Sequence, residues 1–266
     1  MSGRTRILEA FERCRAEGRA ALVGYLTAFD PDRETSRALV HTALGAGVDV
    51  LELGVPFSDP TADGPTIQEA MLRARAAGAT LAGVLELAAE IRTGTDAPII
   101  LFSYANPLLQ LGDALGERLR EAGIDGVLVV DLPAEHANEL REPIHAAGLG
   151  WVGLVAPTTT AERLPTAAGG ATGFVYAITL KGVTGANLGA DRGDLVAQLQ
   201  AIREHTDLPI AAGFGVRDPE QAAALALHAD GVVVGSALIE AARQGADALE
   251  ALVTALRAAL VRPGDA

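Results

Sequence analysis

The chain is 266 residues long and weighs 27.3 kDa, a size that one α/β barrel of roughly 250 residues would fill. Hydrophobic residues make up 49% of it and charged residues 21%, so the sequence can bury a large core and does not have the composition of a disordered chain. The formal net charge of −13 opposes binding to nucleic acid and to anionic membranes, because both are negatively charged.

The cysteine content and the first residues bear on the compartment. Cys14 is the only cysteine, which excludes an intramolecular disulfide and a multi-cysteine metal site and fits a reducing environment. The N-terminal segment mixes arginine with Glu9, Glu12 and Glu17, unlike a signal or transit peptide. No apolar run approaches the ~18 residues that a membrane span needs. We expect a cytoplasmic protein, and we place residues 1–266 in one domain because no linker or composition break divides them.

Short apolar runs alternate with longer amphipathic segments along the chain. Residues 4–17 predict an extra helix before the first run, and residues 67–92 are long enough for two helices after the second. The segments often begin at Asp-Pro or Pro-Glu and end at glycine, as helices do. The eight runs are ALVGYLT from Ala21, VDVLELG from Val48, APIILFSY from Ala97, GVLVVDLP from Gly126, WVGLVAP from Trp151, GFVYAIT from Gly173, PIAAGFG from Pro209 and DGVVVGS from Asp230.

Eight strand and helix units predict a (β/α)8 TIM barrel with an extra N-terminal helix. Most of the runs are nearly continuous in Val, Leu, Ile and Ala, which is typical of parallel strands that are covered on both sides. An open, doubly wound sheet is the alternative. In a TIM barrel the active site lies on the loops that follow the C-terminal ends of the strands, so candidate residues are expected there.

The segment VLELGVPFSDPTADGPTIQ, residues 50–68, places an acidic residue inside an apolar strand. Side chains alternate along a strand, so Val50, Glu52 and Gly54 share one face. If that face is the barrel interior, Glu52 is desolvated near the catalytic end of the strand, and the loss of water raises its pKa. It could then serve as a general acid or base. The alternative is a buried glutamate that is paired with an arginine or a backbone amide.

Three prolines and a glycine stiffen the loop that follows this strand. Asp59 and Asp63 in the loop are both candidates for a second carboxylate. For Asp59, which lies in the sequence Ser-Asp-Pro, we favour a structural turn. For Asp63, a helix cap and a catalytic carboxylate both remain open on this evidence.

Glycines gather at the ends of the predicted strands six, seven and eight. Backbone amides in such loops, together with a helix N-terminus, can hold an anion without a basic side chain. The loops after strands seven and eight are the usual phosphate site of a TIM barrel. The segments are GVTGANLG at residues 182–189, GFG at residues 213–215, and the pair Gly235 and Ser236.

The first of these glycine segments also has the character of a mobile lid. Residues 182–192 form a long stretch with little apolar anchorage. Lys181, the only lysine of the chain, lies just before it. We expect its side chain to be solvated, and contact with a phosphate is the alternative.

Other polar groups fall near the ends of predicted strands. Tyr25 lies in the first strand, Tyr104 follows the third and Tyr176 lies in the sixth, while Asp131 ends the fourth. Each could line a pocket, and each tyrosine could equally fill the core with its hydroxyl satisfied. The five histidines make no metal-ligand spacing, so we expect no metal. The chain also has no nucleophile elbow and no GxGxxG motif, so hydrolase and dinucleotide-binding functions are not indicated.

These motifs, in this order, closely resemble the tryptophan synthase α subunit family. The family signature LELGxPFSDPxADGPxIQ is found with little change at residues 51–68, and the resemblance covers nearly the whole chain. It implies the same (β/α)8 barrel. The other matching motifs are SYANP (103–107), DGVLVVDLP (125–133), LVAPTT (154–159), GFVYAI (173–178), GVTGA (182–186), GFGVRDPEQ (213–221) and DGVVVGSALI (230–239).

The resemblance implies a retro-aldol cleavage of indole-3-glycerol phosphate to indole and glyceraldehyde 3-phosphate. Indole is a poor leaving group until its C3 atom is protonated. Glu52 matches the family's catalytic glutamate, which would protonate C3 and then take the proton of the glycerol hydroxyl. Asp63 matches the catalytic aspartate, which would stabilise the indole N–H as the ring becomes an indolenine. Two carboxyl groups in different environments can divide such work.

The resemblance also implies roles for the remaining candidate residues. The phosphate would lie on backbone amides of Gly185, Phe214, Gly215, Gly235 and Ser236. Tyr25, Tyr104 and Tyr176 match positions that line the substrate pocket. Asp131 and Thr184 match positions behind the pocket or in the lid.

The family implies a partner as well. Its α subunit usually pairs with a β subunit in an α2β2 assembly, and indole passes to the β subunit through a tunnel. The loops after strands two and six close when both sites are occupied. Pyridoxal phosphate belongs to the β subunit, so we expect no cofactor in this chain.

Four positions depart from the family pattern. Phe29 replaces a common glycine before Asp-Pro, Thr61 a common leucine, and Asn187 a common arginine, while Lys181 lies in an unusual stretch before GVTG. None of these changes removes a catalytic group. All lie on loops at the catalytic face, so they bear on the partner, the interface and lid closure.

The departures leave a stand-alone indole-3-glycerol phosphate lyase, which releases free indole for secondary metabolism, as the alternative function. It would share every catalytic residue. A non-catalytic subunit that binds the phosphate ligand fits less well, because Glu52 and Asp63 are both present. Another sugar-phosphate isomerase on the same barrel fits less well because of the PFSDPTADGP loop.

Overall fold

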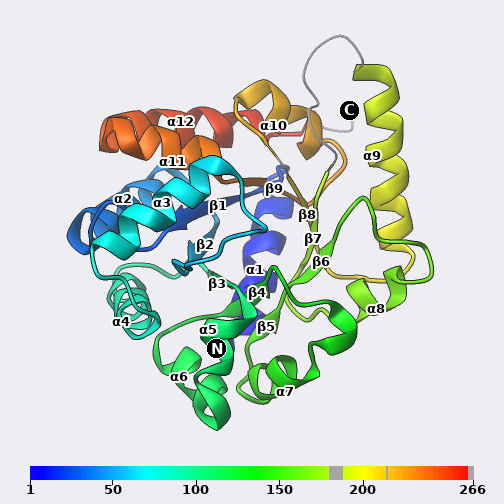
Figure 1. The fold of residues 1–266 in the computed structure, drawn as a ribbon. Coiled ribbons are helices and arrows are strands. Elements are labelled where there is room, and N and C mark those ends of the chain that lie inside the picture. Colours follow the sequence, from blue (N-terminus) through cyan, green and yellow to red (C-terminus); the bar gives the residue numbers. More distant parts are fainter. Residues whose placement is uncertain (180–187, 214, 263–266) are drawn as a thin grey trace.

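The computed structural model describes residues 1–179, 188–213 and 215–262. Its strands form one parallel sheet in the order β5-β4-β3-β2-β1-β9-β8-β7-β6, with helices around the outside (Figure 1). This arrangement confirms the predicted TIM barrel. The strands are β1 (Ala21–Thr27), β2 (Val50–Gly54), β3 (Ile99–Ser103), β4 (Gly126–Val129), β5 (Gly150–Trp151), β6 (Gly153–Val155), β7 (Val175–Ala177), β8 (Ile210–Ala212) and β9 (Gly231–Val234).

The helices agree with the amphipathic segments of the sequence. The predicted extra helix is α1 (Gly3–Ala16), and the long segment after the second strand forms α3 (Pro65–Ala76) and α4 (Leu81–Arg92), as predicted. The other helices of the described residues are α2 (Arg33–Ala46), α5 (Ala105–Leu109), α6 (Leu115–Glu121), α7 (Asn138–Ala146), α8 (Leu164–Gly169), α9 (Leu188–Arg203), α10 (Pro219–Ala226), α11 (Ser236–Gln244) and α12 (Ala246–Ala259), with the 3-10 turns η1 (Gly112–Ala114) and η2 (Ala134–His136).

The fifth predicted strand is divided in two at Val152. β5 pairs with β4, whereas β6 pairs with β7. The amide of Val152 donates to the carbonyl of Val127 at 2.9 Å, and the amide of Gly153 donates to the carbonyl of Phe174 at 3.1 Å. The chain therefore changes its hydrogen-bonding partner within two residues. β5 and β6 together occupy one strand position of the barrel and join the two ends of the sheet.

Helix α1 lies at the N-terminal end of the barrel (Figure 1). Its apolar side chains enter the barrel interior. Ile7 and Phe11 pack there with inward-facing strand residues such as Val50. Glycines at the strand starts make room for them. A Cβ atom at Gly126 would lie 2.9 Å from Ile7 Cδ1, and one at Gly231 would lie 2.9 Å from Phe11 Cε1. This plug closes the barrel at the end opposite the expected active site.

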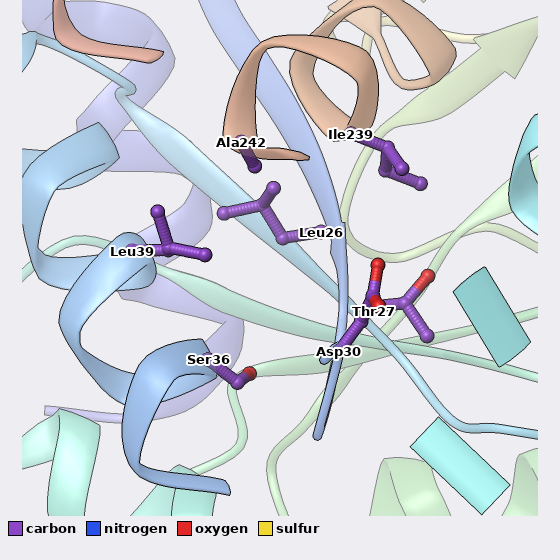
Figure 2. A pocket seen from close by; sticks show the side chains of 7 residues that line it. All are labelled: Leu26, Thr27, Asp30, Ser36, Leu39, Ile239 and Ala242. Atoms are coloured by element: carbon purple, nitrogen blue, oxygen red, sulfur yellow. The ribbon is translucent and has the colours of Figure 1, made fainter. Parts of the chain in front are cut away.

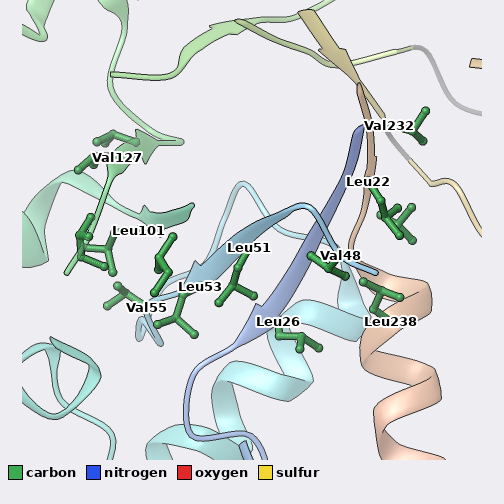
Figure 3. Packing of buried hydrophobic residues seen from close by; sticks show 14 of the residues in the cluster. Leu22, Leu26, Val48, Leu51, Leu53, Val55, Leu101, Val127, Val232 and Leu238 are labelled. Atoms are coloured by element: carbon green, nitrogen blue, oxygen red, sulfur yellow. The ribbon is translucent and has the colours of Figure 1, made fainter. Parts of the chain in front are cut away.

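Besides the apolar barrel interior, a second apolar layer lies between the strands and the surrounding helices (Figure 3). Leu51 and Leu53 belong to this layer, whereas Val50 belongs to the barrel interior. The two sets alternate along β2, as the period of a strand requires. The same alternation directs Glu52 inward.

A buried ion pair joins the end of α1 to the start of the barrel. Arg19 donates to Asp49 through Nη1 at 2.6 Å and through Nη2 at 2.8 Å. Asp49 also accepts the backbone amide of Leu22 at 2.8 Å. Arg19 and Asp49 are 3% and 6% exposed, so both charges are nearly removed from water. The pair therefore links the α1 plug to β1 and to the residue before β2.

Cys14 gives a direct probe of unfolding. It is fully buried, and burial, followed by the charge of Asp49, raises the pKa of its thiol to about 12. We expect an aromatic disulfide reagent at pH 8 to label the native chain at least about 100-fold more slowly than the chain in denaturant, because only the exposed thiol forms thiolate readily. The measurement is the labelling rate by absorbance with and without denaturant. Equal rates would show that α1 does not protect the residue.

Candidate active site

Glu52 lies in β2 and points into the barrel interior, as predicted. Its side chain is 1% exposed, and its Oε1 atom has no hydrogen-bond partner among the described residues. Burial raises the pKa of the carboxyl to about 8. In the described part of the chain, neither an arginine nor a backbone amide pairs with it. This environment differs from that of a paired structural glutamate and suits proton transfer near neutral pH.

Asp63 lies in the loop after β2 and contacts a tyrosine that follows β3. Tyr104 Oη donates to Asp63 Oδ2 at 2.6 Å and accepts the backbone amide of Ala62 at 3.0 Å. Burial raises the pKa of Asp63, and the hydrogen bond from Tyr104 partly offsets that rise. Helix α3 has Gly64 as its N-cap and no side-chain cap hydrogen bond. The alternative that Asp63 caps this helix is therefore wrong.

Two further contacts hold the loop of Asp63, and the sequence reasoning missed both. Gln68 Nε2 donates to the carbonyl oxygens of Pro60 at 3.2 Å and Asp63 at 2.9 Å. Phe57 stacks on Tyr104, with 4.7 Å between ring centroids and an interplanar angle of 22°. Gln68 is the last residue of the signature motif, and this position could have marked it as a residue that supports the loop. Its target could not be read from the sequence, because carbonyl directions depend on the folded loop.

The other two predicted tyrosines lie inside the barrel near the carboxyl groups. Tyr25 in β1 is the register partner of Glu52 in β2, and Tyr176 in β7 packs against the interior cluster. Burial, and then the charges of Glu52 and Asp63, raise the pKa of Tyr176. Three tyrosines from three strands or strand ends thus gather around the two carboxyl groups. Their substrate contacts remain predictions.

Asp131 connects two loops at the same end of the barrel. It is exposed, two residues beyond β4, and its Oδ1 accepts the amide of Ala105 at 2.8 Å. Ala105 is the first residue of α5, so Asp131 satisfies an amide at the N-terminus of that helix. The side chain thereby ties the loop after β4 to the loop after β3. This location agrees with a supporting position, and its functional role stays a prediction.

The predicted phosphate residues are partly described. Gly235 is the N-cap of α11 and Ser236 is its first residue, so free amides of this helix face the catalytic end. Gly215 has φ +70°, a conformation that favours glycine. The phosphate site itself stays a prediction. Five predicted or atypical positions lie outside the described residues: Lys181, Thr184, Gly185, Asn187 and Phe214.

Two atypical loop positions are described. Phe29 has φ +67° although it is not glycine, its ring is buried, and its amide donates to Ser36 Oγ at 3.1 Å. The ring reaches α4, since a Cβ atom at Gly83 would lie 3.0 Å from Phe29 Cζ. Thr61 is exposed, and its amide donates to the carbonyl of Asp59 at 2.8 Å. The turn that we predicted at Asp59 is therefore present.

An ion pair links the loop after β1 to helix α3, and the sequence reasoning did not anticipate it. Arg73 donates to Asp30 through Nε at 2.7 Å and through Nη2 at 2.8 Å. Arg73 lies on the helix that directly follows the Asp63 loop. The two residues are 43 positions apart, and nothing in the local pattern of either predicts the pairing. The contact fixes the direction in which α3 leaves the site.

A small cavity lies beside this loop, between the end of β1, α2 and α11 (Figure 2). Its volume of about 10 Å³ has room for roughly one water molecule and is too small for an organic substrate. It is lined by Leu26, Thr27, Asp30, Ser36, Leu39, Ile239 and Ala242. Glu52 and Asp63 are not among these residues, so this cavity is not the candidate active site.

Residues 1–179, 188–213 and 215–262 contain no group of three His, Cys, Asp or Glu side chains that could hold a metal ion. Within the same ranges, no helix has both the length and the apolar character needed to cross a membrane.

Comparison with known sequences points to one family. Residues 11–262 match the sequence profile of the tryptophan synthase alpha chain. The tryptophan synthase alpha chain of Acidiphilium cryptum is 48% identical over 246 residues, which cover 92% of this chain and 89% of that protein. The alpha chain of Laribacter hongkongensis is 46% identical over 261 residues, covering 96% and 98% of the two chains.

Comparison with solved structures agrees with this result. A chain of tryptophan synthase from Mycobacterium tuberculosis, in an aminoacrylate-bound form, superimposes with a TM-score of 0.88 and 35% sequence identity, covering 96% of this chain and 99% of that one. The tryptophan synthase alpha chain of Legionella pneumophila gives a TM-score of 0.87 and 36% identity, with 98% and 99% coverage. By sequence and by fold, this chain belongs to the tryptophan synthase alpha chain family.

Proposed function

We propose that the chain cleaves indole-3-glycerol phosphate by a retro-aldol reaction to indole and glyceraldehyde 3-phosphate. The observation that carries the proposal is the state of Glu52, which is buried, has a pKa of about 8 and has an unpartnered Oε1 among the described residues. Family membership supports the same reaction. The relatives compared above are named as tryptophan synthase alpha chains, and none of those names favours the stand-alone lyase.

In this proposal Glu52 acts first as an acid and then as a base. Its raised pKa keeps it protonated at neutral pH, so it can deliver a proton to C3 of the indole ring. The ring becomes an indolenine that can accept the electron pair of the bond between C3 and the side chain. The Glu52 carboxylate then takes the proton of the adjacent hydroxyl. That oxygen forms the aldehyde carbonyl as the carbon–carbon bond breaks, and Glu52 recovers its proton.

Asp63 would act on the opposite side of the ring. The indole N–H becomes more acidic and more positive when C3 is protonated, and a carboxylate that accepts its hydrogen bond stabilises this state. The hydrogen bond from Tyr104 favours the ionised form of Asp63 and directs one carboxylate oxygen. The two carboxyl groups thus divide the work, one neutral and one charged.

The remaining features of the proposal follow the family. Backbone amides at Gly215, Gly235 and Ser236, with those of Gly185 and Phe214, would bind the phosphate. We propose that the chain needs no cofactor, works in the cytoplasm and delivers indole to a β subunit, which would hold the pyridoxal phosphate, in an α2β2 assembly.

Indole release by the purified chain, alone and with an added β subunit, tests the function. We expect slow release that rises sharply when the β subunit is added, because the partner would promote closure of the catalytic loops. Fast release that does not respond to the β subunit would replace the partnered function by the stand-alone lyase. No release under either condition would overturn the proposed reaction.

Replacing Tyr104 by phenylalanine tests the support of Asp63. The change removes the hydrogen bond to the Asp63 carboxylate and leaves the Ala62 amide without its acceptor. We expect kcat/KM to fall at least about 10-fold, the lower end of the effect of losing a hydrogen bond to a charged group. Because the lost bond lowers the pKa of Asp63, the acid limb of the pH profile should move to higher pH. A profile that loses height but does not move would contradict this role for Tyr104.

A further inference from the structure

The hydroxyl of Tyr25 lies inside the barrel, just beyond Glu52 toward the catalytic end. The Tyr25 side chain is 2% exposed. A Cβ atom at Gly54 would lie 2.2 Å from Tyr25 Oη, so the hydroxyl rests directly against the α-carbon of Gly54. Gly54 follows Glu52 by two residues on β2 and shares its inward face. The phenol of one strand therefore reaches across to the strand that carries the proposed acid.

Only part of the hydrogen-bonding capacity of this phenol is used. Thr27 Oγ1 donates to Tyr25 Oη at 3.2 Å. The proton of Tyr25 itself has no acceptor within residues 1–179, 188–213 and 215–262. The ring is held by packing, since Phe102 lies edge-on to it with 4.9 Å between centroids. A buried O–H without an acceptor costs free energy, so an acceptor from a ligand would fit it.

Glu52 presents the complementary feature from the next strand. Its Oε1 is an acceptor without a donor among the described residues. Tyr25 and Glu52 are register partners in β1 and β2, so the free donor and the free acceptor share one chamber. A hydroxyl group accepts and donates hydrogen bonds at a single oxygen. One substrate hydroxyl could therefore satisfy both residues.

We propose that Tyr25 is a further catalytic residue, which donates a hydrogen bond to the substrate hydroxyl oxygen next to the indole ring while Glu52 accepts the proton of that hydroxyl. This inference rests on the proposed function and adds a contact to it. As Glu52 removes the proton, negative charge gathers on the oxygen until the carbon–carbon bond breaks and the aldehyde carbonyl forms. A fixed donor at this oxygen stabilises the charge as it develops.

Tyr25 acts only as a donor in this step. Burial, and then the charge of Asp63, raise the pKa of its phenol well above the ordinary value, so the phenol keeps its proton throughout. Glu52 gives one proton to C3 and recovers one from the hydroxyl, so the step stays balanced without proton transfer from Tyr25. The bond is stronger in the transition state than in the bound substrate, because the oxygen then carries more charge.

Thr27 is a positioning residue for this donor. It is 3% exposed, lies on the same face of β1 as Tyr25, and borders the small cavity with Asp30 and Ser36 (Figure 2). Thr27 is the donor in the hydrogen bond between the two hydroxyls, so the Tyr25 proton has to point away from Thr27. Loss of the Thr27 hydroxyl would free the phenol proton to rotate. Serine in its place would retain the donor.

The decisive variant is Tyr25→Phe, assayed for indole release with and without the β subunit. We expect kcat to fall on the order of 10- to 100-fold and KM to rise only several-fold, because the lost bond is already present with bound substrate and strengthens as charge develops. Thr27→Val should lower kcat in the same way but less, and Thr27→Ser should restore it. The melting temperature of each variant reports whether the fold is kept.

A binding experiment separates the proposed contact from a general change of the pocket. In the Glu52→Gln background, Tyr25→Phe should weaken indole-3-glycerol phosphate several-fold by calorimetry. It should not weaken an analogue with hydrogen in place of the hydroxyl next to the ring. Equal effects on both ligands, or an unchanged kcat for Tyr25→Phe in an active enzyme, would overturn the inference alone. A wild-type chain that releases no indole would overturn the proposed function as well.

Discussion

Replacing Glu52 by glutamine should lower kcat for indole release by about 10³-fold, the middle of the range for loss of a general acid–base. Glutamine has the same shape and can occupy the same buried site, but its amide can neither protonate C3 nor take the hydroxyl proton. The variant Glu139→Gln, on the exposed face of α7, is a matched control and should keep full activity. Retention of activity by Glu52→Gln would contradict the central role of this residue.

The pH dependence of the wild-type enzyme should report the same carboxyl group. The pKa of Glu52 is about 8, so the protonated form that supplies the proton to C3 is lost above that pH. We therefore expect kcat/KM to fall by one power of ten per pH unit well above pH 8. The measurement is a pH series of initial rates on the free enzyme at low substrate. A profile that stays flat to pH 10 would exclude Glu52 as the acid.

The substitution Glu52→Gln should also stabilise the fold at alkaline pH. The folded pKa of Glu52, about 8, exceeds the unfolded value of 4.5, so the folded chain binds one more proton between these values. Stability from this group is fully present below pH 4.5 and is lost progressively as pH rises from 4.5 through 8. With about 1.4 kcal/mol per unit, the loss is on the order of 5 kcal/mol. The neutral glutamine of Glu52→Gln does not suffer this pH-dependent loss of stability. The denaturant midpoint of the variant should therefore exceed that of wild type by a margin that grows from pH 5 to 8.5.

Among the substitutions proposed here, Asp49→Ala should cause the largest loss in the free energy of unfolding. The change leaves the guanidinium of Arg19 buried with only Glu17, the carbonyl of Ala20 and little water around it, and it removes the acceptor of the Leu22 amide. Breaking one side of a buried ion pair costs about 3–5 kcal/mol. For a chain of this size the melting temperature should fall on the order of 10 °C.

Denaturant titration of this variant should show the loss, with Cys14 labelling as a second probe of the same region. The exposed Asp113 supplies the control, and Asp113→Ala should change the free energy of unfolding by less than about 0.5 kcal/mol. The site lies at the end of the barrel opposite Glu52, so the folded Asp49→Ala enzyme should keep its kcat. A stability loss below 1 kcal/mol would show that the pair is not a net contributor.

Local sequence pattern predicts the position of one candidate carboxyl group, Glu52, but not the role of the other, Asp63. Side chains alternate between the two faces of a strand, so Glu52 must point inward if Val50 does. The structure agrees with this prediction. The state of Asp63 could not be decided in this way, because Asp before a Gly-Pro helix start suits a cap as well as a catalytic residue. Tyr104, 41 residues later, decides the outcome by taking the carboxylate as its hydrogen-bond acceptor.

The sequence by itself determined the order of strands and helices, the extra N-terminal helix, the catalytic end of the barrel and the inward position of Glu52. These follow from apolar periodicity and from glycine and proline at element ends, which act within a few residues. Tertiary structure alone decided the break at Val152, the pairing of Arg73 with Asp30 and the position of the Tyr25 hydroxyl over Gly54. Each of these depends on which distant groups the closed barrel brings within hydrogen-bond or van der Waals distance.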